Sequence, residues 1–265
     1  MFNMTKNNKK FNFETVFKML EEEGSSFAIA TVIRTMSSTA AKPGMKAIIS
    51  HEGQILSGWL GGSCVTTAVC NTAIETINLK KTKLVVLRPS DLQDDNEIKN
   101  DDQVFHKKNY CPSEGSMDIF VEPFYPKPEL IIYGNTPIAD ELAKFGKKYN
   151  FNVINIVSEA ERIKNSNSNS EKFIVLATQG DGDLRAINDA LENSSNYIGL
   201  VASKKKFTVL KKKMVEDGVS DAKLKRIICP AGIDINAVMP EEVALSIFAE
   251  IIQFKRSGKL TNRKF

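Results

Sequence analysis

Cys64 is the residue of this sequence with the clearest capacity for chemistry. It follows Gly61, Gly62 and Ser63 and begins an apolar run that is compatible with a helix. Adjacent glycines allow positive φ angles and let another molecule approach the backbone, and the unpaired N–H groups at a helix start favour a thiolate over a thiol. We therefore predict a thiol presented at a turn before a helix. The alternative is a small buried cysteine that packs like alanine, since free cysteines are often buried.

The other cysteines and the histidines do not form a metal or disulfide motif. Cys70, Cys111 and Cys229 are scattered without CxxC spacing, so neither a disulfide scaffold nor a zinc knuckle is predicted, and the thiols are expected to be reduced. His51 lies in a predicted turn and His106 in a charged loop, with no clustered acids beside either. We therefore expect neither histidine to hold a metal.

The composition is that of an ordinary globular chain. The 265 residues are 42% hydrophobic and 26% charged, and 36 basic against 32 acidic side chains leave a net charge of +4. That balance is too even to suggest a protein that binds nucleic acid. No apolar run approaches the roughly 18 residues of a membrane span, and the polar start lacks the apolar core of a signal peptide. We expect a cytoplasmic protein of two domains, because a domain commonly holds about 100–200 residues.

The first half of the chain predicts an N-terminal α+β domain over residues 1–125. Apolar residues at helical spacing predict a helix over 13–23 that ends at Gly24. Runs rich in Ile, Val and Thr predict the strands of a small, mostly antiparallel sheet, at 27–36, on both sides of the turn 51–54, at 83–87 and at 117–124. The polar segment 90–110 is predicted to be a surface loop.

The second half predicts a Rossmann-like domain over residues 126–265. Pro126 and Pro128 mark the boundary, because proline stiffens the chain and cannot donate to a central strand ladder. Beyond them, apolar strands alternate with helical patterns, which predicts a parallel sheet covered on both faces. Strands are expected at 130–133, 151–157, 173–177, 197–201 and 226–229, and helices at 138–148, 184–191, 207–216 and 241–255. We expect a ligand in the cleft between the two domains.

The first strand-to-helix turn of this domain departs from the dinucleotide-binding pattern. Gly134 occupies the first glycine position of G-x-G-x-x-G/A, but Thr136 stands where the second glycine lets the backbone meet a pyrophosphate. After the second strand, the only acidic candidate for binding a ribose hydroxyl is Glu159, which is a poor one. The pattern argues against NAD(P) in its usual pose. A helix start at Pro137 still offers N–H groups to a nucleotide or a pterin phosphate.

Six motifs, in order along the chain, point to one family. They are Ser37–Gly44 (SSTAAKPG), Gly61–Cys64 (GGSC), Asp118–Pro123 (DIFVEP), Tyr197–Lys206 (YIGLVASKKK), Pro230–Ile235 (PAGIDI) and Pro240–Ile247 (PEEVALSI). Together they resemble the XdhC/CoxI proteins, which are accessory factors of molybdenum hydroxylases such as xanthine dehydrogenase and carbon monoxide dehydrogenase. The turn from Gly134 to Pro137 is similar to the Gly-Arg-Ser-Pro turn of the branch linked to carbon monoxide dehydrogenase.

This resemblance implies a protein that binds a molybdopterin-type molybdenum cofactor and assists its sulfuration and insertion into a partner hydroxylase, without durable turnover of its own. Cys64 would hold or protect the metal–sulfur end, because thiolates suit soft centres, while Gly61, Gly62 and Ser63 let the cofactor approach. Cys111 lies near a family cysteine and is a second candidate metal ligand, although the glycines that usually follow it are replaced. The expected partners are a molybdenum hydroxylase and a cysteine desulfurase.

Further candidate cofactor-binding residues follow strands of the second domain. They are Gly134, Thr136, Gly180, Asp181, Ser203, Lys204 and Asp234. Lys204 begins a run of three lysines at the edge where α/β sheets bind ligands, so it can pair with a cofactor phosphate; a solvated helix start is the alternative. Gly180 and Asp181 match a family turn, with simple turn chemistry as the alternative. Asp234 either orients a ligand or caps the final helix.

Two other classes of function stay open beside the maturation factor. One is an NAD(P)-dependent oxidoreductase that uses the second domain, and the other is a scaffold that keeps the fold without the cofactor site. Thr66 stands where many relatives carry an acid, which would weaken the family's chemistry. The final helix has more apolar surface than one core-facing stripe needs, so a homodimer is predicted there.

Overall fold

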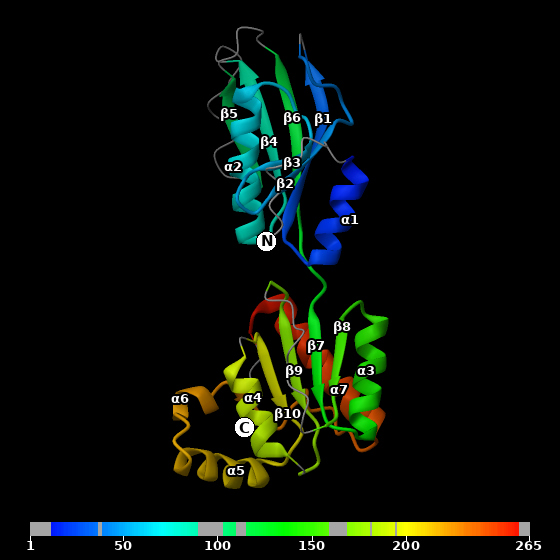
Figure 1. Ribbon diagram of the computed structural model, residues 1–265, viewed down its shortest axis with the longest axis vertical. Coiled ribbons are helices and arrows are strands. Elements are labelled where there is room, and N and C mark those ends of the chain that lie inside the picture. Colours follow the sequence, from blue (N-terminus) through cyan, green and yellow to red (C-terminus); the bar gives the residue numbers. More distant parts are fainter. Residues whose placement is uncertain are drawn as a thin grey trace. The chain divides into compact units, whose positions relative to one another are not determined.

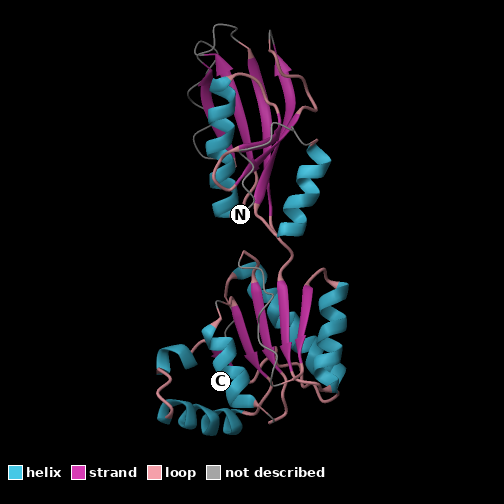
Figure 2. Ribbon diagram, in the orientation of Figure 1, coloured by secondary structure: helices cyan, strands magenta, loops and turns pink. Residues whose placement is uncertain are grey.

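The computed structural model describes residues 12–36, 39–89, 103–109, 115–158, 169–180, 182–193 and 195–259. The chain divides into two compact units, residues 1–126 and 127–265, each containing one sheet with helices beside it (Figures 1 and 2). No helix within the described ranges combines the length and the apolarity needed to cross a membrane.

The first unit is built on a six-stranded sheet. Its strands are β1 (Phe27–Met36), β2 (Lys46–Ser50), β3 (Ile55–Gly58), β4 (Lys83–Pro89), β5 (Val104–Asn109) and β6 (Ser116–Phe124), and its helices are α1 (Phe13–Glu23) and α2 (Ser63–Leu79). The order across the sheet is β3-β2-β1-β6-β4-β5, with β4 and β5 parallel and the other neighbours antiparallel. The predicted α+β domain with a mostly antiparallel sheet is confirmed.

The helices of the first unit cover opposite faces of the sheet. The core beneath α2 contains Ala28, Ala30, Val32, Val65, Ala68, Val69, Ala73, Val85, Leu87, Met117, Ile119 and Val121. The core beneath α1 contains Val16, Leu20, Phe27, Ile29 and Ile48. Because successive strand residues face opposite sides, the residues that alternate with the first set lie on the α1 side of the sheet.

Strand β5 corrects the prediction that segment 90–110 is a surface loop. It pairs with β4 in parallel, from Leu84 opposite Val104 to Pro89 opposite Asn109. It lies at the edge of the sheet, where charged side chains are common because they discourage the open edge from pairing with another chain. Its sequence, VFHKKN, therefore lacks the apolar alternation that marks the inner strands. The rest of that segment lies outside the described residues.

The second unit is a five-stranded parallel sheet with helices on both faces, as predicted. Its strands are β7 (Glu129–Tyr133), β8 (Asn152–Ile156), β9 (Lys172–Leu176), β10 (Tyr197–Leu200) and β11 (Ile227–Ile228). Its helices are α3 (Pro137–Lys148), α4 (Asp183–Glu192), α5 (Lys204–Glu216), α6 (Asp221–Leu224) and α7 (Pro240–Ser257). Helices α3 and α7 pack on one face, and α4, α5 and α6 on the other. The four-residue helix α6 was not predicted, because it is too short to show a helical period.

The order of the strands in this sheet determines where a ligand can bind. The order β8-β7-β9-β10-β11 places the first strand of the unit between the second and the third. The chain therefore leaves β7 toward one side and returns to the other side at β9. Ligands of such doubly wound sheets bind where the direction changes, beyond the carboxyl ends of the strands.

Helix α7 uses its apolar surface inside the second unit. Five of the six residues that suggested a homodimer are buried or pack against the core shared with α3, namely Val243, Ile247, Phe248, Ile251 and Ile252. Leu245 is 49% exposed. The excess of apolar residues is explained by packing on both α3 and the sheet, so this helix gives the predicted homodimer no support.

Candidate functional site

Cys64 lies in the first turn of α2, with its side chain exposed. The helix begins after Gly62, which has φ −70° and ψ 174°. Gly61, one residue earlier, has φ +123°, a conformation that side chains rarely adopt. The predicted thiol at a turn before a helix is therefore present, and the alternative of a buried, alanine-like cysteine is wrong.

The turn before Cys64 leaves room for another molecule. A Cβ atom added at Gly62 would meet no heavy atom within 4 Å. The N-cap residue, Gly62, has no side chain with which to cap the helix, and the first turn contains no acidic residue. The first N–H groups of a helix have no partner within the helix and carry partial positive charge. This turn thus combines an exposed sulfur atom, an open backbone and a preference for anions.

The remaining cysteines are poorer candidates for chemistry. Cys70 is half-buried, and burial raises the pKa of its thiol. Cys229 is also half-buried and donates a hydrogen bond from Sγ to the Ala202 carbonyl at 3.3 Å. Cys111, the second predicted metal ligand, lies outside the described residues. Among the cysteines that the structure describes, Cys64 is the exposed one.

In the second unit, Gly134 and Thr136 follow β7 at the change of strand direction. Gly134 has φ +112°, and a Cβ atom there would lie 2.3 Å from the Ala177 carbonyl oxygen. The glycine is therefore required because two backbone segments pass close to each other. The Thr136 hydroxyl accepts a hydrogen bond from the Ala139 N–H at 3.2 Å and caps α3, with only 6% of the residue exposed. Both residues thus have structural tasks that do not involve a ligand.

Asp183 organises the turn that follows β9. Its carboxylate accepts hydrogen bonds from the Thr178 hydroxyl and the Gly180 N–H, the latter at 3.2 Å, and forms an ion pair with Lys206 Nζ at 2.6 Å. Burial by itself would raise the pKa of Asp183, but the hydrogen bonds from Lys206 and Thr178 outweigh it and lower the pKa below its usual value. Gly180 is thereby tied to α4, while Asp181 lies outside the described residues.

A small pocket lies at the carboxyl ends of β7, β8 and β9. It encloses about 70 Å³ and is lined by Tyr133, Gly134, Ile156, Val157, Thr178, Gly182 and Arg185. The Arg185 guanidinium donates to the Ser158 carbonyl at 3.2 Å, just beyond β8. Glu159, the acid considered for a ribose hydroxyl, lies outside the described residues. Pockets for cofactors are commonly about 300–1,000 Å³, so this one is far smaller than a dinucleotide needs.

The last three predicted residues also lie at carboxyl ends of strands. Ser203 caps α5 by accepting a hydrogen bond from the Lys206 N–H at 3.2 Å, and Lys204 is exposed at the first position of that helix. Asp234 accepts from the Asn236 N–H at 3.3 Å within a turn. It does not cap α7: the N-cap residue of that helix is Met239, and the Glu242 side chain, three residues further on, accepts from the backbone N–H groups of Val238 and Met239. These hydrogen bonds lower the pKa of Glu242.

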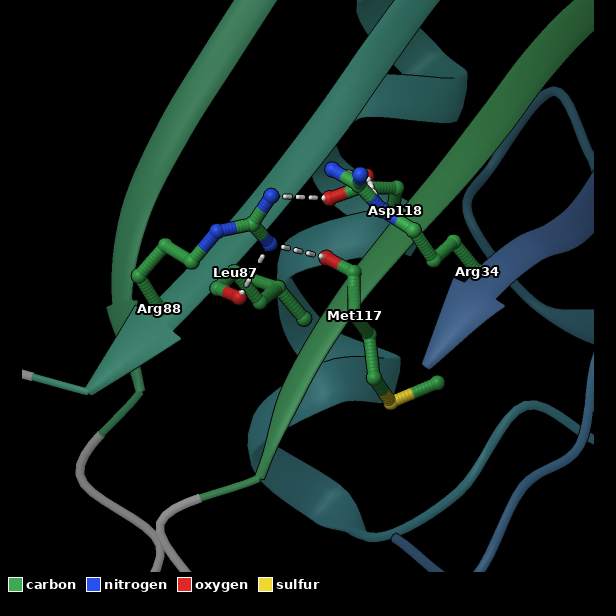
Figure 3. Close-up of polar contacts among 5 residues, drawn as sticks. All are labelled: Arg34, Leu87, Arg88, Met117 and Asp118. Carbon is green, nitrogen blue, oxygen red and sulfur yellow. Dashed lines mark hydrogen bonds and ion pairs between the residues drawn. The ribbon is translucent and has the colours of Figure 1, made fainter. Parts of the chain in front are cut away.

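A cluster that sequence reasoning missed lies on the α1 side of the first sheet, where Arg34 and Arg88 flank Asp118 (Figure 3). The Asp118 carboxylate is 2.8 Å from Arg34 Nε and 2.6 Å from an Nη of each arginine. Arg88 also donates to the carbonyls of Leu87 at 2.9 Å and Met117 at 3.3 Å. Two cations share one anion, and the Arg34 side chain is 60% exposed. The sequence signals at this position were an acid inside an otherwise apolar strand and the motif that Asp118 begins, neither of which identified the arginine partners.

His106 adds a third basic group to that face. It pairs with Val86 across β4 and β5, and Val86 pairs with Asp118 across β4 and β6, so the three side chains share a face. Burial and the positive charge of Arg88 lower the pKa of His106, against the opposing effect of Asp118. His106 Nε2 is buried and makes no hydrogen bond within the part of the chain that the structure describes.

Comparison with known proteins follows the division into two units. Residues 20–88 match the XdhC and CoxI family, and residues 130–251 match the XdhC Rossmann domain. The chain belongs to the XdhC and CoxI family. The turn that presents Cys64 lies in the first matched segment, and the change of strand direction after β7 lies in the second. Arg34 and Arg88 lie within the first segment, whereas Asp118 lies between the two.

Two further comparisons of this XdhC/CoxI-family chain gave matches along most of its length. It is 23% identical over 275 residues to the uncharacterized protein YqeB of Escherichia coli strain K12, with 93% of this chain and 47% of YqeB covered. The chain thus spans about half the length of this curated relative. A crystal structure described as a xanthine dehydrogenase from Bacillus halodurans is 17% identical, with 96% of this chain and 99% of that chain covered and a TM-score of 0.43.

Proposed function

We propose that this chain is an accessory factor of a molybdenum hydroxylase. It binds a molybdopterin-type cofactor and assists its sulfuration and its insertion into the partner enzyme, with a cysteine desulfurase as the source of sulfur. One observation carries the proposal: within a chain of this family, the Cys64 thiol is exposed on an uncapped helix turn. Membership of the family supports the partner class, and the thiol supports the chemistry.

The residues around Cys64 fit such a cofactor. A thiolate is a soft ligand and matches molybdenum or sulfur. The open space at Gly62 admits a bulky group, and the uncapped N–H groups of α2 suit its anionic parts. The described residues contain no cluster of three or more His, Cys, Asp or Glu side chains that could hold a metal. The metal would therefore arrive held by its own pterin, which supplies the metal–sulfur chemistry when bound, and Cys64 would add one protein ligand.

The first test measures pterin bound to the purified protein. The full chain is expressed in a host that makes the cofactor, and released pterin is quantified by fluorescence after oxidation. We expect pterin with the wild type and with Cys70→Ser, and a loss of pterin and of hydroxylase activation with Cys64→Ser. Cys70 is a matched control because it lies on the same helix but is half-buried. Equal pterin and equal activation with Cys64→Ser would contradict the role of the thiol.

A second variant tests the approach over the turn. Gly62→Asn places a side chain in the open space and supplies a good helix cap, since asparagine at this position satisfies a backbone N–H. We therefore expect the free energy of unfolding to stay equal or to rise while bound pterin falls. A Gly62→Asn protein that retains as much pterin as the wild type would show that the cofactor does not approach there.

A nicotinamide dinucleotide is the second candidate ligand, at the carboxyl edge of the second sheet. In its favour, the Arg185 side chain lines the pocket beside the end of β8, where doubly wound sheets place a ribose and its phosphate. Against it are the volume of about 70 Å³ and the Thr136 cap. Titration with NADPH, followed by nucleotide fluorescence, decides between them. Binding with nicotinamide-dependent turnover would replace the accessory role with an oxidoreductase.

A further inference from the structure

A larger pocket lies at the opposite edge of the second sheet, away from the change of strand direction. It encloses about 520 Å³, within the usual range of ligand pockets. Its lining comes from the amino ends of β10 and β11 and the carboxyl end of α7, and consists of Ser195, Asn196, Ile198, Lys225, Arg226, Ile228, Phe254, Gly258 and Lys259. We call it the β10–β11 pocket. Of the six sequence motifs, Tyr197–Lys206 reaches the lining, through Ile198, and none of the residues predicted to bind a cofactor lies in it.

The charged residues of the β10–β11 pocket are all positive. Lys225, Arg226 and Lys259 line it, and no carboxylate does. Asp221 lies 3.4 Å from Lys225 Nζ, but the same carboxylate also binds Lys211 at 2.6 Å. Because Asp221 is shared by Lys211 and Lys225, it does not fully neutralise Lys225, and the net charge of the pocket lining is positive.

Arg226 is positioned by neutral groups. Its guanidinium donates to the Leu191 carbonyl at 3.4 Å and to the Ser195 hydroxyl at 3.3 Å. Both bonds are long, and within the described ranges no carboxylate lies within the 4.0 Å of an ion pair with Arg226. The guanidinium is therefore oriented but keeps its charge and donors for an anion.

Apolar side chains form another part of the lining. Ile228 and the Phe254 ring are partly buried against the core beneath α7, and the Phe254 ring packs edge to face against Tyr197 with centroids 6.1 Å apart. An inorganic anion would leave this surface exposed to water, whereas a flat apolar group would cover it. We propose that the β10–β11 pocket binds a small organic anion, whose charged group lies on Arg226 and Lys259 and whose apolar ring lies on Phe254 and Ile228.

Calorimetric titration of the full chain with chosen probes tests this proposal. The probes are 1-naphthyl phosphate, 1-naphthoate, neutral 1-naphthol and inorganic phosphate. We expect at least one of the two naphthyl anions to bind at least tenfold more tightly than 1-naphthol and inorganic phosphate, and the tighter of the two identifies the anionic group. No binding of either anion at millimolar concentration, or equal binding of 1-naphthol, would overturn the proposal.

Variants locate the binding. Arg226→Gln is expected to raise the Kd at least about tenfold, because it removes a hydrogen bond between charged groups. Lys259→Gln is a second variant that keeps the test valid if Arg226→Gln is poorly folded, because Lys259 follows α7 and its side chain is exposed. Lys212→Gln, on an exposed position of α5, is the control for loss of one charge and should bind as the wild type does. Unchanged binding in both pocket variants would refute the assignment, whatever the outcome at Cys64.

Discussion

Asp118→Asn removes the shared anion of the arginine cluster while keeping the size of the side chain. The Asp118 side chain is 10% exposed and lies between Arg34, which is 60% exposed, and Arg88, which is 17% exposed. After the substitution, Arg88 keeps its contacts to the Leu87 and Met117 carbonyls but loses its carboxylate. We therefore expect the variant to destabilise the first unit.

The expected loss comes mainly from Arg88. An ion pair with an exposed partner such as Arg34 contributes about 0.5 kcal/mol, because water and salt screen it. A hydrogen bond between charged groups in a mostly buried site contributes about 1.5–3 kcal/mol, and removing one partner leaves the other unsatisfied. We expect Asp118→Asn to lower the free energy of unfolding by about 2–4 kcal/mol.

Urea unfolding followed by tryptophan fluorescence measures this effect in the correct unit, because the sequence has a single tryptophan, Trp59, and it lies in the first unit. Glu52→Gln is the matched control for the loss of an exposed carboxylate in the same unit. Glu52 lies 3.9 Å from His51, and both side chains are more than half exposed (59% and 67%), so the change should stay below about 1 kcal/mol. In a double-mutant cycle of Asp118→Asn and Arg88→Met, the losses of unfolding free energy should be strongly non-additive. A loss below about 1 kcal/mol in Asp118→Asn, or an additive cycle, would refute the reasoning.

Three further predictions concern single residues. Gly134→Ala should cost about 3 kcal/mol or more in thermal or urea unfolding, because the new Cβ would meet the Ala177 oxygen at 2.3 Å; a loss within 1 kcal/mol would contradict this. Asp183 has a lowered pKa, so the stability it adds is present above its usual value of 3.8 and is lost as the pH falls through the folded-state value. Asp183→Asn leaves Lys206 without its carboxylate, so the free energy of unfolding should change less with pH in that acid range than it does in the wild type. An unchanged dependence on pH would count against the hydrogen-bond network of Asp183. His106 also has a lowered pKa, so below its usual value of 6.5 the unfolded chain takes up the proton first and stability falls. In His106→Gln the urea midpoint should change less between pH 7.5 and 5.5 than in the wild type, and an equal change would show that His106 is not responsible.

The sequence alone predicts the order of most elements, because their signals are local. Apolar spacing and the glycine after it predict a helix over 13–23, and α1 has those bounds; a run of β-branched residues predicts a strand over 27–36, and β1 has those bounds. In the second unit the alternation of strands and helices predicts the parallel sheet. These patterns depend on neighbours within a few residues, which the chain carries with it in any fold.

Elements whose stability depends on distant partners were harder to predict. Strand β5 has little apolar alternation, and its register comes from β4, which lies beyond a long insert. Helix α7 looked too apolar for one core, because the sequence does not show that α3 and the sheet both pack against it. In both cases the deciding contacts are formed by segments that are separated in the sequence.

For the site, the sequence by itself determined the local geometry at Cys64: two glycines and a helix start place a thiol at a turn, and steric limits on φ give that result without reference to the rest of the chain. Only the tertiary structure decided which charges meet. Arg34 and Asp118 are 84 positions apart and face each other because a register shift between Val32 and Arg34 brings the arginine opposite the acid. The β10–β11 pocket likewise joins two strand ends to the end of α7. The charge of a cluster and the volume of a pocket depend on residues from several strands and helices, which strand register and packing bring together. A short stretch of sequence therefore does not reveal them.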